Sequence, residues 1–190
     1  MGLLSWVIAL MAISAAGAAY TNRQVTLGPT AVAYIHLLAL ALFVGVGDWV
    51  NFVQGIVSFR TLPKTQFGLL QSRLLPYFFQ VLTLSLAAGL VTATKVGSVG
   101  LVHVLSVALV LTLANLLFLE PYTTAIMFQR HRLEKEAASA EEAAKLPKHK
   151  ALSKKFGMYH GLSALASLGL PCVEDAWSYI SRPAAGGAKP

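Results

Sequence analysis

Long apolar runs alternate with short polar stretches along the whole chain. The runs span residues 3–20, 30–59, 74–94, 99–119 and 157–180, and each is interrupted by only a few polar residues. A helix needs about 20 mostly apolar residues to cross a hydrocarbon core of roughly 30 Å. The pattern predicts an all-α fold, a multi-pass transmembrane helical bundle of four core spans that follow an N-terminal apolar segment.

Composition agrees with a membrane protein. Hydrophobic residues make up 56% and charged residues 12% of the 190 positions, whereas a soluble domain carries about 25% charged residues. A chain of this length is expected to form one bundle. The single cysteine, Cys172, excludes an intrachain disulfide and a metal site built from several cysteines.

Basic residues gather in the loops that share one side of the predicted bundle. If successive runs alternate in direction, loops 60–73 and 130–155 together hold 11 of the 15 Lys and Arg residues. Cytoplasmic loops are enriched in Lys and Arg, so this side is predicted to be cytoplasmic, or stromal in a plastid. Because topology explains the net charge of +7, no nucleic-acid partner is expected.

Two interpretations of residues 1–20 are open. The segment could be a retained signal anchor, or a signal peptide cleaved near the small residues Ala16, Gly17 and Ala18. No basic residue precedes the apolar run, which weakens the signal-peptide interpretation. A plastid transit peptide is rich in Ser and Arg, and residues 1–20 are not. The endoplasmic reticulum, another secretory-pathway membrane or the plasma membrane is therefore favoured over the plastid.

The predicted membrane domain covers residues 30–180 and includes a helical cytoplasmic loop at 121–155. This loop is rich in Ala, Glu, Lys and Arg, which are good helix formers. We expect a solvated helix that continues the fourth apolar run and ends at Pro147. Its positive charge either reflects the orientation rule or attracts anionic lipid. Residues 181–190 are predicted to be a flexible tail.

A polar stripe interrupts the second apolar run. Asp48, Asn51 and Gln54 recur at three-residue spacing and are expected on one helix face, near Gly55. An ionisable residue at membrane depth is expected to face the bundle interior or a wet cavity. The stripe either lines a path for a cation or substrate, or makes hydrogen bonds between helices.

Other features indicate packing rather than chemistry. Gly157 and Gly161 form a G-x-x-x-G spacing that lets two helices approach closely, with another span or another protomer as the open alternatives. His36, His103 and His160 do not have the spacing of a metal pair, and Glu174 and Asp175 are expected at the membrane interface. No nucleophile, phosphate-loop or dinucleotide-binding motif is present. No cofactor or metal is therefore expected.

Several blocks together carry a family resemblance. They are WVNFVQG at 49–55, FRTLP at 59–63, FGLLQSRLLP at 67–76, EPYTTAIM at 120–127 and YHGLS at 159–163. Their order and spacing over residues 30–170 resemble the transmembrane protein 205-like family, and residues 129–136 look most like its plant-type members. The resemblance implies a four-helix membrane core and supplies no catalytic or ligand residue. Asp48 departs from the family pattern, in which this position is neutral.

The family-like blocks bring polar residues to the cytoplasmic ends of three predicted spans. Gln71 and Arg73 precede one span, Glu120 ends the next, and His160 enters the last. We expect these four side chains to cluster at the cytoplasmic mouth of the bundle. The cluster either clamps the helix ends together or binds a headgroup or other ligand.

These observations favour a non-enzymatic membrane protein. The leading hypothesis is a scaffold or accessory subunit, in contact with the lipid bilayer and with a membrane-protein partner or further copies of itself. The alternative is a small transporter or channel-like protein that uses Asp48, Asn51 and Gln54. An intramembrane enzyme would depend on His160 or Glu120.

Overall fold

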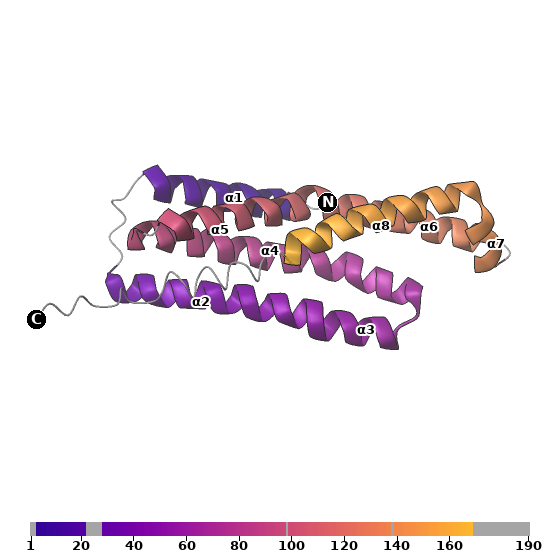
Figure 1. The fold of residues 1–190 in the computed structure, drawn as a ribbon, viewed down its shortest axis with the longest axis horizontal. Helices are drawn as coiled ribbons and strands as arrows, with labels where there is room; N and C mark the ends of the chain where they lie inside the picture. The colour runs from indigo at the N-terminus through magenta and orange to yellow at the C-terminus, as the bar shows by residue number, and fades with distance from the viewer. Residues whose placement is uncertain (1–2, 22–27, 98, 138, 169–190) are drawn as a thin grey trace, which may run out of the picture.

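The computed structural model describes residues 3–21, 28–97, 99–137 and 139–168, and every regular element among them is helical (Figure 1). This confirms the predicted all-α class. The α-helices are α1 (Leu3–Thr21), α2 (Pro29–Asp48), α3 (Gly55–Thr61), α4 (Lys64–Val96), α5 (Val99–Ala114), α6 (Glu120–Glu136), α7 (Ala140–Lys145) and α8 (Pro147–Leu168). Two π-helical segments, η1 (Trp49–Gln54) and η2 (Asn115–Leu119), join α2 to α3 and α5 to α6.

Three continuous helical rods dominate the elongated bundle. They cover Pro29–Thr61, Lys64–Lys95 and Val99–Glu136, and each is long and apolar enough to cross a membrane. At 1.5 Å per residue the rods measure about 48 to 57 Å, so each extends well beyond a hydrocarbon core of roughly 30 Å. A shorter apolar helix lies at Leu4–Ala15. The chain is a multi-pass integral membrane protein.

Helix α4 is the centre of the bundle and packs against α1, α2 and α5. Its residues Leu82, Leu86 and Leu90, spaced one helical turn apart, lie in the core with Phe43 of α2 and Leu105 of α5. Burying one such leucine contributes about 1.5–3 kcal/mol in a water-exposed protein. In a bilayer, where lipid tails are as apolar as leucine, the contacts stabilise mainly through close packing.

The helices reverse direction at two tight connections, as the sequence predicts. The rod that contains α3 ends at Thr61, and Pro63 immediately precedes α4. At the other end of α4, Gly97 adopts a left-handed conformation with φ of 79° and donates to the carbonyl of Ala93. Glycine suits this position because it has no Cβ to clash. Helices α4 and α5 are therefore antiparallel neighbours (Figure 1).

Helices α6, α7 and α8 form an arm at the end of the bundle where α3 and α4 meet (Figure 1). The single solvated helix expected up to Pro147 is wrong. Helix α6 ends at Glu136, and Ser139 caps α7 by accepting a hydrogen bond from the Glu142 amide at 3.2 Å. Pro147 begins α8, since the first helical turn needs no amide donor from it.

The helix that contains the last apolar run begins earlier than predicted. Helix α8 begins ten residues before the predicted boundary at 157 and is described as far as Leu168. Within the described ranges α8 is not among the helices long and apolar enough to span a membrane. The rest of the predicted span, with Cys172, Glu174 and Asp175, and the tail at 181–190 lie outside the described residues.

Candidate functional site: a polar cavity at Glu120

Two rods carry an acidic residue at the same depth. Asp48 directly precedes η1, and Glu120 directly follows η2. Counted from the opposite end of the bundle, where α2 and α5 begin, both residues lie about 30 Å along their helices. This distance equals the thickness of a hydrocarbon core. If α2 and α5 begin at one membrane surface, the two π-helical segments lie at the other, which is the side predicted to be cytoplasmic. Such segments are frequent at functional sites.

Glu120 is buried at this boundary, with only 7% of its surface exposed. The Thr124 hydroxyl, one turn further along α6, donates a 2.8 Å hydrogen bond to its Oε1 atom. A cavity of about 390 Å³ opens beside the carboxyl group. Its lining combines three hydroxyl side chains with an apolar wall, and consists of Ser5, Ser72, Pro76, Leu116, Glu120, Pro121, Thr124, Ala125 and Phe128.

Helices α1 and α4 supply the hydroxyls that face Glu120 across the cavity. Ser5 is buried and accepts a 3.1 Å hydrogen bond from the Gln80 amide group, which fixes α1 against α4. Ser72 donates to the carbonyl of Leu69 at 2.8 Å. Residues from α1 and from two of the rods, far apart in sequence, thus converge on one space. Ser5, Ser72 and Thr124 had not been predicted as site residues, because single hydroxyls carry no pattern in the sequence.

The expected cluster of Gln71, Arg73, Glu120 and His160 does not assemble around Glu120. Arg73 and His160 are exposed, and the His160 ring stacks on Phe156 with centroids 5.5 Å apart. Gln71 is half-buried and its Oε1 atom has no hydrogen-bond partner. In the part of the chain that the structure describes, no ion pair joins Glu120 to Arg73 or His160. The neighbour of both Gln71 and Arg73, Ser72, reaches the cavity instead.

The predicted stripe in the second run is divided by the π-helix. Asp48 and Asn51 are exposed, whereas Gln54 is half-buried and donates to the Ser58 hydroxyl at 3.1 Å. A π-helix has more residues per turn than an α-helix, so a spacing of three no longer keeps side chains on one inward face. Asp48, Asn51 and Gln54 line neither the cavity at Glu120 nor a second one beside His36.

The described histidines do not form a metal site. His36 is buried and its Nδ1 atom shares a hydrogen bond with the Thr92 hydroxyl, while His103 is exposed. Among the described residues, no three His, Cys, Asp or Glu side chains lie close enough together to hold a metal ion.

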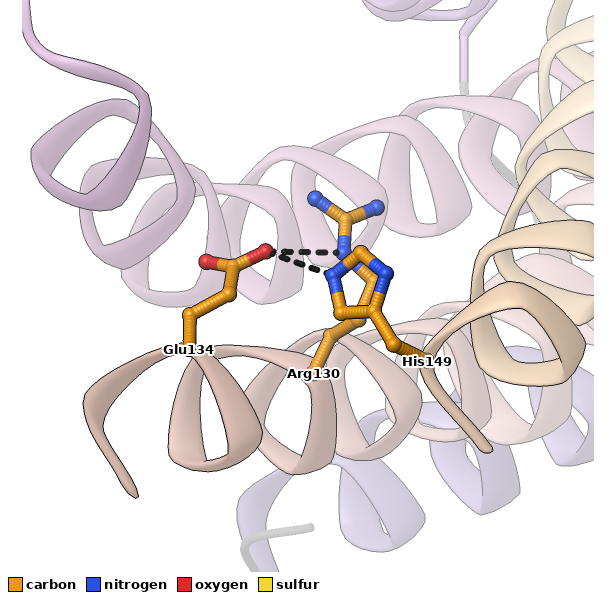
Figure 2. Close-up of polar contacts among 3 residues, drawn as sticks. All are labelled: Arg130, Glu134 and His149. Carbon is orange, nitrogen blue, oxygen red and sulfur yellow. Dashed lines mark hydrogen bonds and ion pairs between the residues drawn. The ribbon is translucent and has the colours of Figure 1, made fainter. Parts of the chain in front are cut away.

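Polar contacts among Arg130, Glu134 and His149 connect two helices of the arm (Figure 2). Glu134 Oε1 lies 3.0 Å from His149 Nε2 and 3.5 Å from Arg130 Nε, and the Arg130 guanidinium lies 5.3 Å from the Phe156 ring centre. Burial alone would raise the pKa of the Glu134 carboxyl. The hydrogen bond from His149 and the charges of Arg130 and His131 outweigh burial, so its pKa lies below the usual value of 4.5. These contacts join α6 to the start of α8.

Two further contacts hold α8 along α6 as far as the membrane boundary. The Tyr122 and Tyr159 rings meet edge to face with centroids 4.6 Å apart. The buried Asn115 amide in η2 donates to the Ser163 carbonyl at 3.3 Å and to the Ser167 hydroxyl at 3.4 Å. The predicted packing residues Gly157 and Gly161 do not take part, because a Cβ atom added at either would meet nothing within 4 Å.

Comparisons with known proteins agree with this architecture. A family profile described as "Domain of unknown function (DUF4149)" matches residues 38–132, which is half of the chain and includes η1, α4 and η2. The zebrafish (Danio rerio) protein "Transmembrane protein 205" is 29% identical over 172 residues, covering 79% of this chain and 92% of the relative. No solved structure gives a significant match. The chain therefore belongs to the DUF4149 family of transmembrane protein 205-like membrane proteins.

Proposed function

We propose that the protein is a non-enzymatic scaffold or accessory subunit that binds a partner membrane protein through its helical arm. The observation that carries this proposal is the outer face of α8. Helix α8 packs against α6, α7 and the η2 region, and among the described residues its opposite face is exposed. An open face on a helix that is otherwise fixed in place is suited to a second protein.

The open face combines small and large apolar residues. Gly157 and Gly161 lie one turn apart, and Met158, Leu162 and Leu165 beside them are 53%, 48% and 68% exposed. Small residues at this spacing allow a second helix to approach the backbone, and the flanking side chains enclose it. The face extends towards the membrane boundary, because Ser163 and Ser167 on the packed side of α8 contact Asn115. We therefore infer that the occupant is a helix of another membrane protein.

Basic residues surround the beginning of this face. Lys148, Lys150, Lys154 and Lys155 are all exposed on α8, and the positive-inside rule assigns such a surface to the cytoplasm. The proposed contact is therefore on the cytoplasmic side. A membrane of the secretory pathway, such as the endoplasmic reticulum, remains our prediction for the compartment.

The test is the native mass and composition of the protein extracted gently from its own membrane. The natural chain should migrate as a particle that contains another membrane protein in fixed ratio. Replacing Gly157 and Gly161 with leucine should release that protein, because the new side chains fill the space of the partner helix. A Cβ atom added at either position meets no described atom within 4 Å, and leucine is a better helix former than glycine, so the variant should fold normally.

Gly45→Leu is the matched control. Gly45 is also exposed and its added Cβ atom also meets nothing within 4 Å, but it lies in α2 away from the arm. The control should keep the partner. A natural chain that is monomeric, or a double leucine variant that keeps its partner, would contradict the proposal. A particle that holds only further copies of this chain would replace the accessory-subunit role with homo-oligomerisation.

The transporter alternative has less support. It requires Asp48, Asn51 and Gln54 to line a path through the bundle, whereas Asp48 and Asn51 are exposed on the outside. A substrate flux that is lost in Asp48→Asn would favour transport over scaffolding.

A further inference from the structure

The cavity beside Glu120 has a hydrogen-bonding character that selects one class of ligand. It is about 390 Å³ in volume, which lies within the range of small-molecule sites. It is separate from the open face of α8, so what it binds is independent of the scaffold role proposed above.

The hydroxyl groups of this cavity have largely used their protons. Ser72 donates its proton to the Leu69 carbonyl, and Thr124 donates its proton to Glu120. A hydroxyl oxygen that has donated still carries two acceptor lone pairs. Both residues therefore offer acceptors to the cavity, and an ionised Glu120 would add only acceptors. Ser5, which accepts from Gln80, keeps one proton to donate.

The charge of the lining agrees with this arrangement. Glu120 is its one ionisable residue, and no lysine or arginine lines it. Arg73, which follows Ser72 in the chain, is exposed rather than turned into the cavity. An ionised carboxylate in a buried position is costly, and a positively charged ligand would offset that cost.

We propose that this cavity binds a primary ammonium group. An ammonium group carries three proton donors and no acceptor, which matches the acceptors of Glu120, Ser72 and Thr124. Phe128 adds an aromatic ring to the wall, and a cation beside an aromatic face is attracted by its quadrupole. A phosphate or carboxylate would meet the Glu120 charge and find few donors.

The position of the cavity limits where the ammonium group comes from. Ala125 and Phe128 in its wall are exposed, so the cavity can be reached from the outer surface of the bundle. With the start of α5 at one membrane surface, Glu120 lies about 30 Å away at the other, where lipid headgroups are found. The ammonium group therefore belongs to an ethanolamine-type lipid or to a free alkylamine that partitions into the membrane.

The test is native mass spectrometry of the full-length protein in detergent. Phosphatidylethanolamine and phosphatidylcholine with identical acyl chains differ only in the ammonium group. The ethanolamine group is a primary ammonium that donates protons, and the choline group is a quaternary ammonium that donates none. The protein should bind the ethanolamine lipid about tenfold more tightly, since the choline group cannot make charge-assisted hydrogen bonds. Dodecylamine should displace it. Binding of dodecylamine without a preference between the lipids would assign the site to free amines, and binding of neither amine would overturn the proposal.

Two variants connect binding to this cavity. Glu120→Gln keeps the shape and can still accept from Thr124 but removes the charge, and it should weaken ammonium binding about tenfold or more. Ala125→Leu keeps Glu120 and fills the cavity, so it should weaken binding if the site is used. Glu136→Gln is the control, because Glu136 lies on the same helix but is exposed and paired with Arg132. Folded Glu120→Gln and Ala125→Leu proteins that bind like the natural chain would exclude the site.

Discussion

His149 of α8 lies against Glu134 of α6, with its Nε2 atom 3.0 Å from the carboxylate Oε1, although 15 residues separate them in the chain. The contact (Figure 2) lies near the outer end of the arm, where α7 turns the chain back on itself (Figure 1). Both side chains are largely buried, with 12% and 25% of their surfaces exposed. The pair therefore fixes where α8 begins relative to α6.

Replacing His149 with alanine should loosen the arm. The change removes one partly buried, charge-assisted contact, and we expect a loss of about 1–2 kcal/mol in unfolding free energy. Amide hydrogen exchange should rise in α7 and in the first turns of α8 while α4 and α5 keep their protection. The control is Glu136→Gln, which breaks a fully solvent-exposed pair with Arg132 and should leave exchange unchanged. Equal protection in His149→Ala and the natural protein would contradict the prediction.

The arm should also weaken in acid. The pKa of Glu134 lies below its usual value in the folded protein, and the group lies well beyond Leu119, where the apolar part of its helix ends. A carboxyl with a lowered folded pKa stabilises the fold above its unfolded pKa, and this contribution is lost as the pH falls through the folded pKa. The natural protein should melt higher than Glu134→Gln at pH 7, and the difference should disappear as the pH falls through the lowered pKa of Glu134. A difference that persists in acid would exclude this cause.

Gly68→Ala should destabilise the protein, although alanine is the better helix former. Gly68 lies where α4 meets α6, and an added Cβ atom would lie 2.7 Å from Met127 Sδ and 3.0 Å from His131 Cε1. The buried Met127 must shift, at a cost of about 1–3 kcal/mol, against a gain of up to about 1 kcal/mol in helix propensity. The matched change Gly45→Ala meets open space and should raise the melting temperature. Thermal unfolding in detergent measures both, and a stabilised Gly68→Ala would show that the interface adapts freely.

Asn115→Leu should release the far end of α8. The Asn115 amide is 1% exposed and makes two hydrogen bonds to α8, while leucine has a similar volume and preserves packing in the core. We expect a modest change in overall stability of about 1 kcal/mol. Protease cleavage should increase near Ser163 and stay unchanged in α6. Unaltered cleavage there would mean that Tyr122 and Tyr159 suffice to hold α8.

The N-terminal segment should remain in the mature protein. Ser5, Ala9 and Ala12 are buried, and they recur at the spacing of one face of α1, which packs against α4. Removing α1 would expose that part of α4 and would delete Ser5 from the Glu120 cavity. The mass of the protein purified from its own membrane should include the residues of α1. A mass that lacks about 20 residues would identify a cleaved signal peptide.

The sequence predicted the rods well, because hydrophobic length and turn residues act locally. The break at Pro63 and the reversal near Gly97 both follow from the conformational limits of those residues. The expectation that a helix ends at Pro147 is wrong, because proline can also begin a helix, as it does for α8. Ser139, which caps α7, indicates that a new helix begins before Pro147 instead of one long helix that ends there.

The site was less predictable, since it depends on which helix faces meet. Glu120 lies inside a rod that continues to Glu136, and its expected partners Arg73 and His160 lie exposed. The π-helical segment η1 changes the direction in which the side chains around Asp48 and Asn51 point. No residue type in η1 predicts a π-helix. The contact between Glu134 and His149 depends on the turn made by α7, which no spacing in the sequence reveals.

The turn at Gly97 has a consequence for how the protein is made. Only two residues separate the end of α4 from the start of α5, and a connection this short cannot cross the bilayer independently of both helices. During synthesis the two helices must therefore enter the membrane as one hairpin. A substitution that makes either helix less apolar should impair the insertion of both, so defects in this pair should reduce the amount of protein in the membrane before they affect what it binds.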